Sequence, residues 1–273
     1  MVAHLVRMGA MTLLILACMF FPFLPGGYDP LAVTLSGMAQ LFGVAGGLLL
    51  IPVGALWLIF RDKGYYFAIA AVIASSMVAA IATLGAFFNV GLSLGLVALA
   101  LWTYCLTRIA PKLKLLKNAE AGRFNPAPLY LLVLPAVAVV AQFSLVGPAI
   151  EFSRRYAIAQ SAELINDIEE YHKANGRYPV SLLALHKDYK PSVIGIDQFH
   201  YEPSGDAYNV FFEQFSNELG AREIVMYNKL DEHFMASHAQ DILLWTPEQL
   251  RARRGYFAIH DAAIPHWKYF WFD

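Results

Sequence analysis

Long stretches without a charged residue dominate the first half of this chain. Asp, Glu, Lys and Arg are absent from residues 8–28, 30–60, 64–107 and 124–150. A helix that crosses about 30 Å of hydrocarbon needs about 20 apolar residues, and the longest stretch can supply two crossings, divided by the polar turn signal at Asn89 and Gly91. The sequence therefore predicts a polytopic α-helical membrane protein with five transmembrane helices, at residues 5–24, 36–60, 65–87, 91–108 and 128–150.

The overall composition supports a membrane protein and argues against nucleic-acid binding. The chain is 58% hydrophobic with a mean hydropathy of +0.48, which is too apolar for an ordinary soluble domain. Residues 151–273 carry twelve Lys and Arg against eighteen Asp and Glu, a net charge of −6. An acidic domain cannot neutralise phosphates, so we expect the lipid bilayer and other proteins, but no nucleic acid, as partners.

The positive charges predict how the chain is oriented in the membrane. With five crossings, Arg7, the pair Arg61 and Lys63, and the basic residues of the 108–123 loop all lie on one side. The positive-inside rule makes that side cytoplasmic, with the domain after residue 151 outside. Arg154 and Arg155, just beyond the fifth helix, oppose this assignment, but the 108–123 loop outweighs them with five positive residues.

Small residues recur in the predicted membrane helices. Gly43 and Gly47 form a small-x-x-x-small pair, and Gly91 and Gly95 open the fourth helix. Such residues let helix backbones approach closely in lipid. These four glycines are candidate interface residues, either within the bundle or towards another membrane subunit.

The membrane helices contain few groups that could carry chemistry. No ionisable residue lies at the centre of any predicted span, whereas ion-coupled transporters place such groups there. Ser93 lies in a G-x-S-x-G pattern, but no histidine occurs in a later membrane helix to act as its base. Transport and intramembrane hydrolysis are therefore disfavoured.

The residues after the fifth span predict a small α+β domain. Helical periodicity continues from Ile150 to Ala174, with Ile168 on the apolar face, so the membrane helix should extend as one rod to a cap at Gly176. A short helical turn is expected at 181–185 and a capped helix at 246–250. Strands are expected at 199–201, 208–212, 223–227 and 267–272, the first two joined as a hairpin.

One motif in this domain resembles a known family. Tyr171 is followed by Gly176, Tyr178 and Pro179, then by Leu182 and Leu185, ahead of the hairpin. A membrane-derived helix followed by this G-x-Y-P turn is similar to the type IV pilins and the pseudopilins of type II secretion. The resemblance covers about residues 130–272 and implies a long helix packed on a small antiparallel sheet.

The chain also departs from the pilin pattern. Four further helices precede the pilin-like segment, and residues 128–142 contain neither a leader junction nor a glutamate. We therefore expect a pilin-like head that is neither processed nor polymerised. The predicted domains are residues 1–127, a four-helix membrane region with a basic cytoplasmic loop, and residues 128–273, a fifth span leading into the head. The resemblance implies a bacterial inner membrane with the head in the periplasm.

The head is rich in histidine, but the spacing does not indicate a metal site. The densest group contains Asp231, Glu232, His233 and His238, and its two histidines are five residues apart rather than four. We expect scattered surface histidines, no catalytic residue, no metal and no cofactor. The resulting hypothesis is a non-enzymatic scaffold within a membrane complex. The alternatives are a transporter or channel accessory component, or an enzyme with an unrecognised site in the outer domain.

Overall fold

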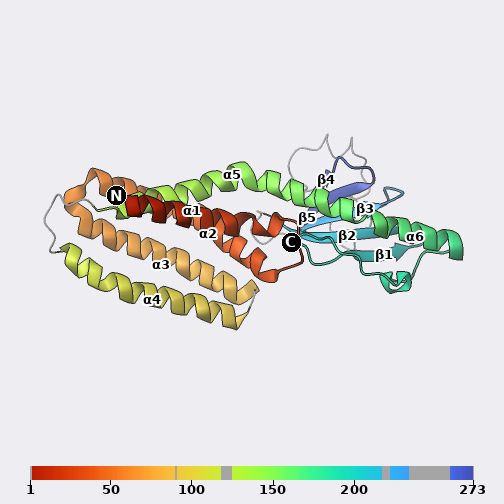
Figure 1. Cartoon of the computed structure of the whole chain (residues 1–273), viewed down its shortest axis with the longest axis horizontal. Helices are drawn as coiled ribbons and strands as arrows, with labels where there is room; N and C mark the ends of the chain where they lie inside the picture. The colour runs from red at the N-terminus through yellow and green to blue at the C-terminus, as the bar shows by residue number, and fades with distance from the viewer. Residues whose placement is uncertain (1, 90, 118–124, 217–221, 234–258, 273) are drawn as a thin grey trace. The chain divides into compact units, whose positions relative to one another are not determined.

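The computed structural model describes residues 2–89, 91–117, 125–216, 222–233 and 259–272 (Figure 1). The chain divides into two compact units. Unit 1 comprises residues 1–21 and 31–147, and unit 2 comprises residues 22–30 and 148–273. The predicted boundary at residue 127 differs from this division, because the first half of the fifth helix packs within unit 1 and because the first interhelical loop belongs to unit 2.

Within the described residues, five helices are long and apolar enough to cross a membrane, as predicted. They are α1 (Val2–Phe20), α2 (Pro30–Ile59), α3 (Gly64–Asn89), α4 (Leu92–Lys117) and α5 (Ala127–Gln160), with short 3₁₀ turns at η1 (Phe21–Phe23) and η2 (Arg61–Lys63). A helix pairs its own backbone N–H and C=O groups, for which the bilayer interior offers no hydrogen-bond partner. Helices α3 and α4 lie side by side (Figure 1). Helix α4 extends nine residues beyond the predicted end at Arg108, because its basic last turns can remain helical outside the hydrocarbon.

Unit 2, which we call the head, is a helix packed on an antiparallel sheet. The C-terminal part of α5 continues into α6 (Ala162–Asn175) and then the 3₁₀ turn η3 (Leu182–Leu185), which confirms the turn predicted there. The strands are β1 (His200–Ser204), β2 (Ala207–Phe215), β3 (Arg222–Asn228), β4 (Ile259–Asp261) and β5 (Trp267–Phe272). Their order in the sheet is β1-β2-β3-β5-β4, and every neighbouring pair is antiparallel.

The prediction of one uninterrupted helix is wrong at a single residue. Ser161 separates α5 from α6, and its hydroxyl donates to the Ile158 carbonyl at 2.7 Å. A serine hydroxyl that donates to a carbonyl of the preceding turn offers the backbone an alternative to regular helical hydrogen bonding. Helical bonding still resumes across the break, since Ile165 N–H donates to the Ser161 carbonyl at 2.9 Å. The predicted cap is confirmed: Gly176 has φ +68° and donates to the His172 carbonyl.

The head core lies between these helices and one face of the sheet. Ile168 is fully buried, as predicted, together with Leu164 of α6 and with Tyr208 and Phe212 of β2. Ala162, at the start of α6, is exposed, and the buried stripe of this helix passes through Leu164. The second face of β2 is also buried, at Ala207, Asn209 and Phe211.

The loop between α1 and α2 forms part of the head. Residue Pro25 forms an antiparallel bridge with Val193. Four backbone hydrogen bonds surround this bridge: Gly26 to Ser192, Asp29 to Ile194, Ile194 to Leu24 and Gly195 to Pro22, all between 2.7 and 3.0 Å. Phe23 also stacks on Phe215 of β2, with ring centroids 6.0 Å apart. The head is thus assembled from two segments that are separated in sequence by more than a hundred residues.

Candidate functional site

A chain of neutral polar side chains links three helices within unit 1. Ser36 Oγ on α2 donates to the Met19 carbonyl of α1 at 2.6 Å, and Gln40 Nε2 donates to Ser36 Oγ at 3.1 Å. Gln142 Nε2 on α5 donates to Gln40 Oε1 at 3.0 Å. All three polar side chains are buried, and Gln142 Oε1 has no hydrogen-bond partner among the described residues. The sequence does not predict this network, because neutral Ser and Gln residues do not interrupt an apolar span and Gln40 lies 102 positions from Gln142.

The candidate glycines of α2 face α5 of the same chain. A Cβ placed on Gly43 would lie 3.2 Å from the Ala138 backbone, and one on Gly47 would lie 2.5 Å from Val139 Cγ2. A Cβ on Gly54, near the end of α2, would lie 3.0 Å from Leu131 Cβ. These contacts favour packing within the bundle over an interface with another subunit, because Gly43 and Gly47 both lie against α5 of the same chain.

The other two glycines lie at the junction of α3 and α4. Gly91 has φ +115° and no neighbour within 4 Å of a notional Cβ, so it serves the turn rather than a helix contact. A Cβ on Gly95 would lie 2.5 Å from the Phe87 ring, so this position lets α3 and α4 pack closely. Ser93, of the G-x-S-x-G pattern, lies in the first turn of α4.

The residues of the pilin-like motif form an aromatic stack at the end of α6. The Tyr178 ring stacks on His172 at 4.1 Å and lies 4.9 Å from Tyr208 of β2. The buried Pro179 accepts a hydrogen bond from the Tyr201 hydroxyl at 2.8 Å through its carbonyl. Tyr171, the first residue of the motif, lies in the last turns of α6 before the Gly176 cap. The motif residues therefore join the helix to the sheet, which is a structural role.

A buried ion pair joins α5 to the sheet within the head. Arg154 donates to Glu223 of β3 through Nε at 2.8 Å and through Nη2 at 3.0 Å, and it also pairs with Glu151. Its guanidinium lies 3.6 Å from the centroid of the Tyr269 ring. Burial raises the pKa of Glu223, whereas the hydrogen bonds from Arg154 act in the opposite direction.

The prediction that the histidines lie on the surface is wrong for His233. This side chain is fully buried, and its ring nitrogens lie 3.2 Å from the Asp231 carbonyl and 3.0 Å from the His266 carbonyl. Burial lowers the pKa of His233 to about 4, and the nearby charge of Lys268 adds to the shift. The two carbonyl contacts favour the protonated ring, but desolvation outweighs them.

The described residues contain no grouping with metal-site chemistry. No cluster of three or more His, Cys, Asp or Glu side chains occurs among them. His266 contacts Asp231 at 3.2 Å, and His260 stacks on Tyr269. His238 and the predicted helix at 246–250 lie outside the described residues.

No match was found to protein-family models, to curated proteins or to solved structures.

Proposed function

We propose that this protein is a non-enzymatic subunit of a larger membrane complex, which presents a pilin-like extracytoplasmic head to another protein. The observation that carries the proposal is the composition of the head. It contains the continuation of one candidate span, α5, and the loop that connects two others, α1 and α2. A domain built from segments that enter and leave the membrane suits presentation at its surface better than a domain on a long linker.

The same contacts support the five-span topology from which the basic residues predict the orientation. Backbone bonds between residues 22–29 and residues 192–195 require the α1–α2 loop and the head to occupy one side of the membrane. Four candidate spans, α2 to α5, separate the loop from the head, and an even number of crossings returns the chain to the same side. Arg154 opposes the predicted orientation in a simple charge count. It is buried and paired with acidic groups, however, so it does not act as a free positive charge on the outer side. The proposed location is a bacterial inner membrane with the head in the periplasm.

The head carries an exposed apolar pair that could receive a partner. Val180 and Leu183, on either side of Ser181 and Leu182, are 78% and 84% exposed. Large aliphatic side chains at this exposure, next to a turn held by Pro179, are candidates for protein contact. The other large exposed apolar side chains of the described head are about half-exposed: Leu24, Tyr28, Phe152 and Leu230.

Photocrosslinking in native membranes tests the proposed partner. A photoreactive amino acid at Val180 or Leu183 should give one discrete adduct with a second protein. The same amino acid at Leu115, an exposed position near the end of α4, provides the matched control and should not give that adduct. A normally inserted protein that gives no adduct from either head position would count against the scaffold role and favour an enzymatic head.

A pair of cysteines tests the composition of the head separately. Pro25 and Val193 face each other across an antiparallel bridge, where Cα atoms lie about 4.5–5.5 Å apart, within reach of a disulfide. With Cys18 and Cys105 replaced by Ser, Pro25→Cys with Val193→Cys should form an intramolecular disulfide without added oxidant in an oxidising compartment. Pairing Pro25→Cys with Leu183→Cys should not. A failure of the first pair in correctly inserted protein contradicts the proposed side of the loop or its place in the head.

A further inference from the structure

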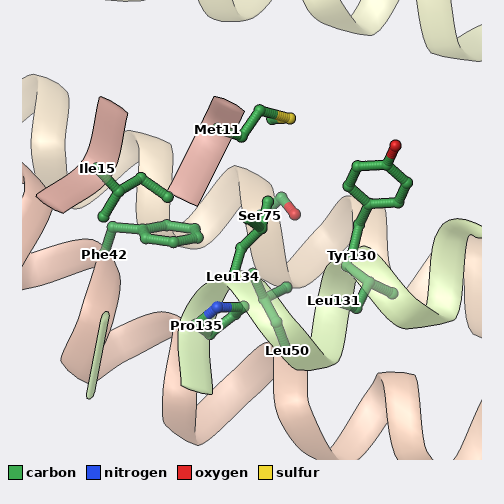
Figure 2. Close-up of a pocket in the computed structure, with 9 residues that line it drawn as sticks. All are labelled: Met11, Ile15, Phe42, Leu50, Ser75, Tyr130, Leu131, Leu134 and Pro135. Carbon is green, nitrogen blue, oxygen red and sulfur yellow. The ribbon is translucent and has the colours of Figure 1, made fainter. Parts of the chain in front are cut away.

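A cavity of about 390 Å³, which is partly open to the outside, lies within unit 1 among α1, α2, α3 and α5 (Figure 2). Its lining is apolar except for Ser75 and the hydroxyl of Tyr130. The aliphatic and aromatic wall is contributed by Met11 and Ile15 of α1, Phe42 and Leu50 of α2, and Leu131, Leu134 and Pro135 of α5. All four helices are candidate membrane spans, so the cavity lies where bilayer lipids are the abundant apolar molecules.

One border of the cavity, at Tyr130, reaches towards the basic end of the bundle. Tyr130, at its border, lies three residues from the start of α5 and donates to the His4 carbonyl near the start of α1, at 3.1 Å. Figure 2 shows the Tyr130 hydroxyl turned away from Leu134 and Pro135. The end of α2 meets the same end of α5, since a Cβ on Gly54 would lie 3.0 Å from the Pro128 carbonyl. Lys117, at the end of α4, lies over the Tyr65 ring of α3.

Arg7 is the basic residue nearest in sequence to the cavity lining. It precedes the lining residue Met11 by four positions on α1, and residues at this spacing lie one above the other on a helix face. Arg7 is exposed and has no ion-pair partner among the described residues. An anionic group above the cavity would therefore find a cation at about one helical turn from the apolar lining.

The size of the cavity distinguishes between two apolar occupants. Its lining on α2 extends from Phe42 to Leu50, a rise of about 12 Å. A transmembrane helix of a partner would run along about 30 Å of hydrocarbon, more than twice the length of this lining. A single flexible acyl chain can occupy a lining of this length.

We infer that this cavity binds one acyl chain of an anionic phospholipid, whose phosphate pairs with Arg7. Basic groups beside an interhelical pocket on the cytoplasmic side are suited to anionic headgroups. The site is independent of the head and of the scaffold role proposed for it. It would couple the packing of α1 against α2 and α5 to the presence of the lipid.

Native mass spectrometry of the delipidated full-length protein in detergent tests this site. The probes are phosphatidylglycerol and phosphatidylcholine with identical acyl chains. Wild-type protein should bind one phosphatidylglycerol at least tenfold more tightly than phosphatidylcholine. Ser75→Phe, which fills the cavity, should reduce binding about tenfold, whereas Ile73→Phe, at an exposed position on the same helix, should bind as wild type does.

The charge variants keep the test decisive if Ser75→Phe does not fold. Arg7→Gln should abolish the preference for phosphatidylglycerol and retain acyl-chain binding, while Lys114→Gln, at the exposed basic end of α4, should retain the preference. Equal affinity of wild-type protein for the two lipids would overturn the proposed headgroup contact. Unchanged binding in folded Ser75→Phe, or a second polypeptide crosslinked from Met11, would overturn the assignment of the cavity to a lipid.

Discussion

The guanidinium of Arg154 donates two hydrogen bonds to the carboxylate of Glu223, at 2.8 and 3.0 Å, from α5 to β3. Both side chains are buried, so neither could recover hydration if the other were removed. Removing one member of a buried pair typically costs about 3–5 kcal/mol, because the remaining charge is left without a partner.

We therefore expect Glu223→Ala to lower the free energy of unfolding by about 3–5 kcal/mol, measured by denaturant unfolding of the full chain in detergent. The double variant Arg154→Met with Glu223→Met should be less destabilised than Glu223→Ala. Arg155→Ala is the matched control, since Arg155 is 59% exposed and should change stability by at most about 1 kcal/mol. Equal effects of Glu223→Ala and Arg155→Ala would show that the buried pair is not formed.

The core of the head gives a second prediction. Ile168 is fully buried against the sheet, so Ile168→Ala should cost about 2–5 kcal/mol through lost burial and the cavity left behind. Leu183→Ala, at a highly exposed aliphatic position, should change stability by about 0.5 kcal/mol or less. The unfolding midpoint followed by tryptophan fluorescence checks both. An unchanged midpoint for Ile168→Ala would mean that this face of α6 is not in the core.

The polar chain within the membrane unit predicts non-additive effects. Gln40→Leu leaves both ends of the buried Gln142 amide unpaired, whereas Gln142→Leu also removes an oxygen that already lacks a partner. Gln40→Leu should therefore be the more destabilising single change, by about 1–2 kcal/mol. The double variant should recover part of that loss in thermal unfolding. Strict additivity of the two single effects would contradict the hydrogen bond between these amides.

His233 predicts a dependence of stability on pH. Its pKa is about 4 in the folded protein and about 6.5 in an unfolded chain, so the unfolded state takes up the proton first as pH falls. The stabilisation by this group is complete above pH 6.5 and is lost as pH falls through 4, by about 3 kcal/mol in total. His233→Gln should be less sensitive to acid between pH 7 and pH 4 than wild type. His186→Asn, at an exposed left-handed position, is the control and should keep the wild-type slope.

The membrane helices could be predicted because the bilayer imposes a length and a polarity that are visible in any single span. The ends of the helices were less predictable. Helix α4 continues through basic residues to Lys117, because charged residues can remain helical once the chain has left the hydrocarbon. In the head, the alternation around Tyr208–Phe212 and the Gly176 cap are local signals, and both elements were anticipated. Strand β4 was missed because three residues carry too little periodicity to be recognised.

The contacts that define the candidate sites depend on residues far apart in sequence. Arg154 and Glu223 are 69 positions apart and Gln40 and Gln142 are 102 apart, so no spacing rule could pair them. Arg154 entered the sequence argument only as a positive charge on the outer side. The backbone pairing of Pro25 with Val193 has no side-chain signature at all, since any two extended segments can form it.

Reporter fusions test most directly the central claim that the head is outside the cytoplasm. A reporter enzyme that is active only outside the cytoplasm should be active when fused after Asp273 and inactive when fused after Lys117, with both fusions present at similar levels. Activity after Lys117 together with silence after Asp273 would contradict the orientation, and with it the proposed role of the head as an extracytoplasmic binding domain.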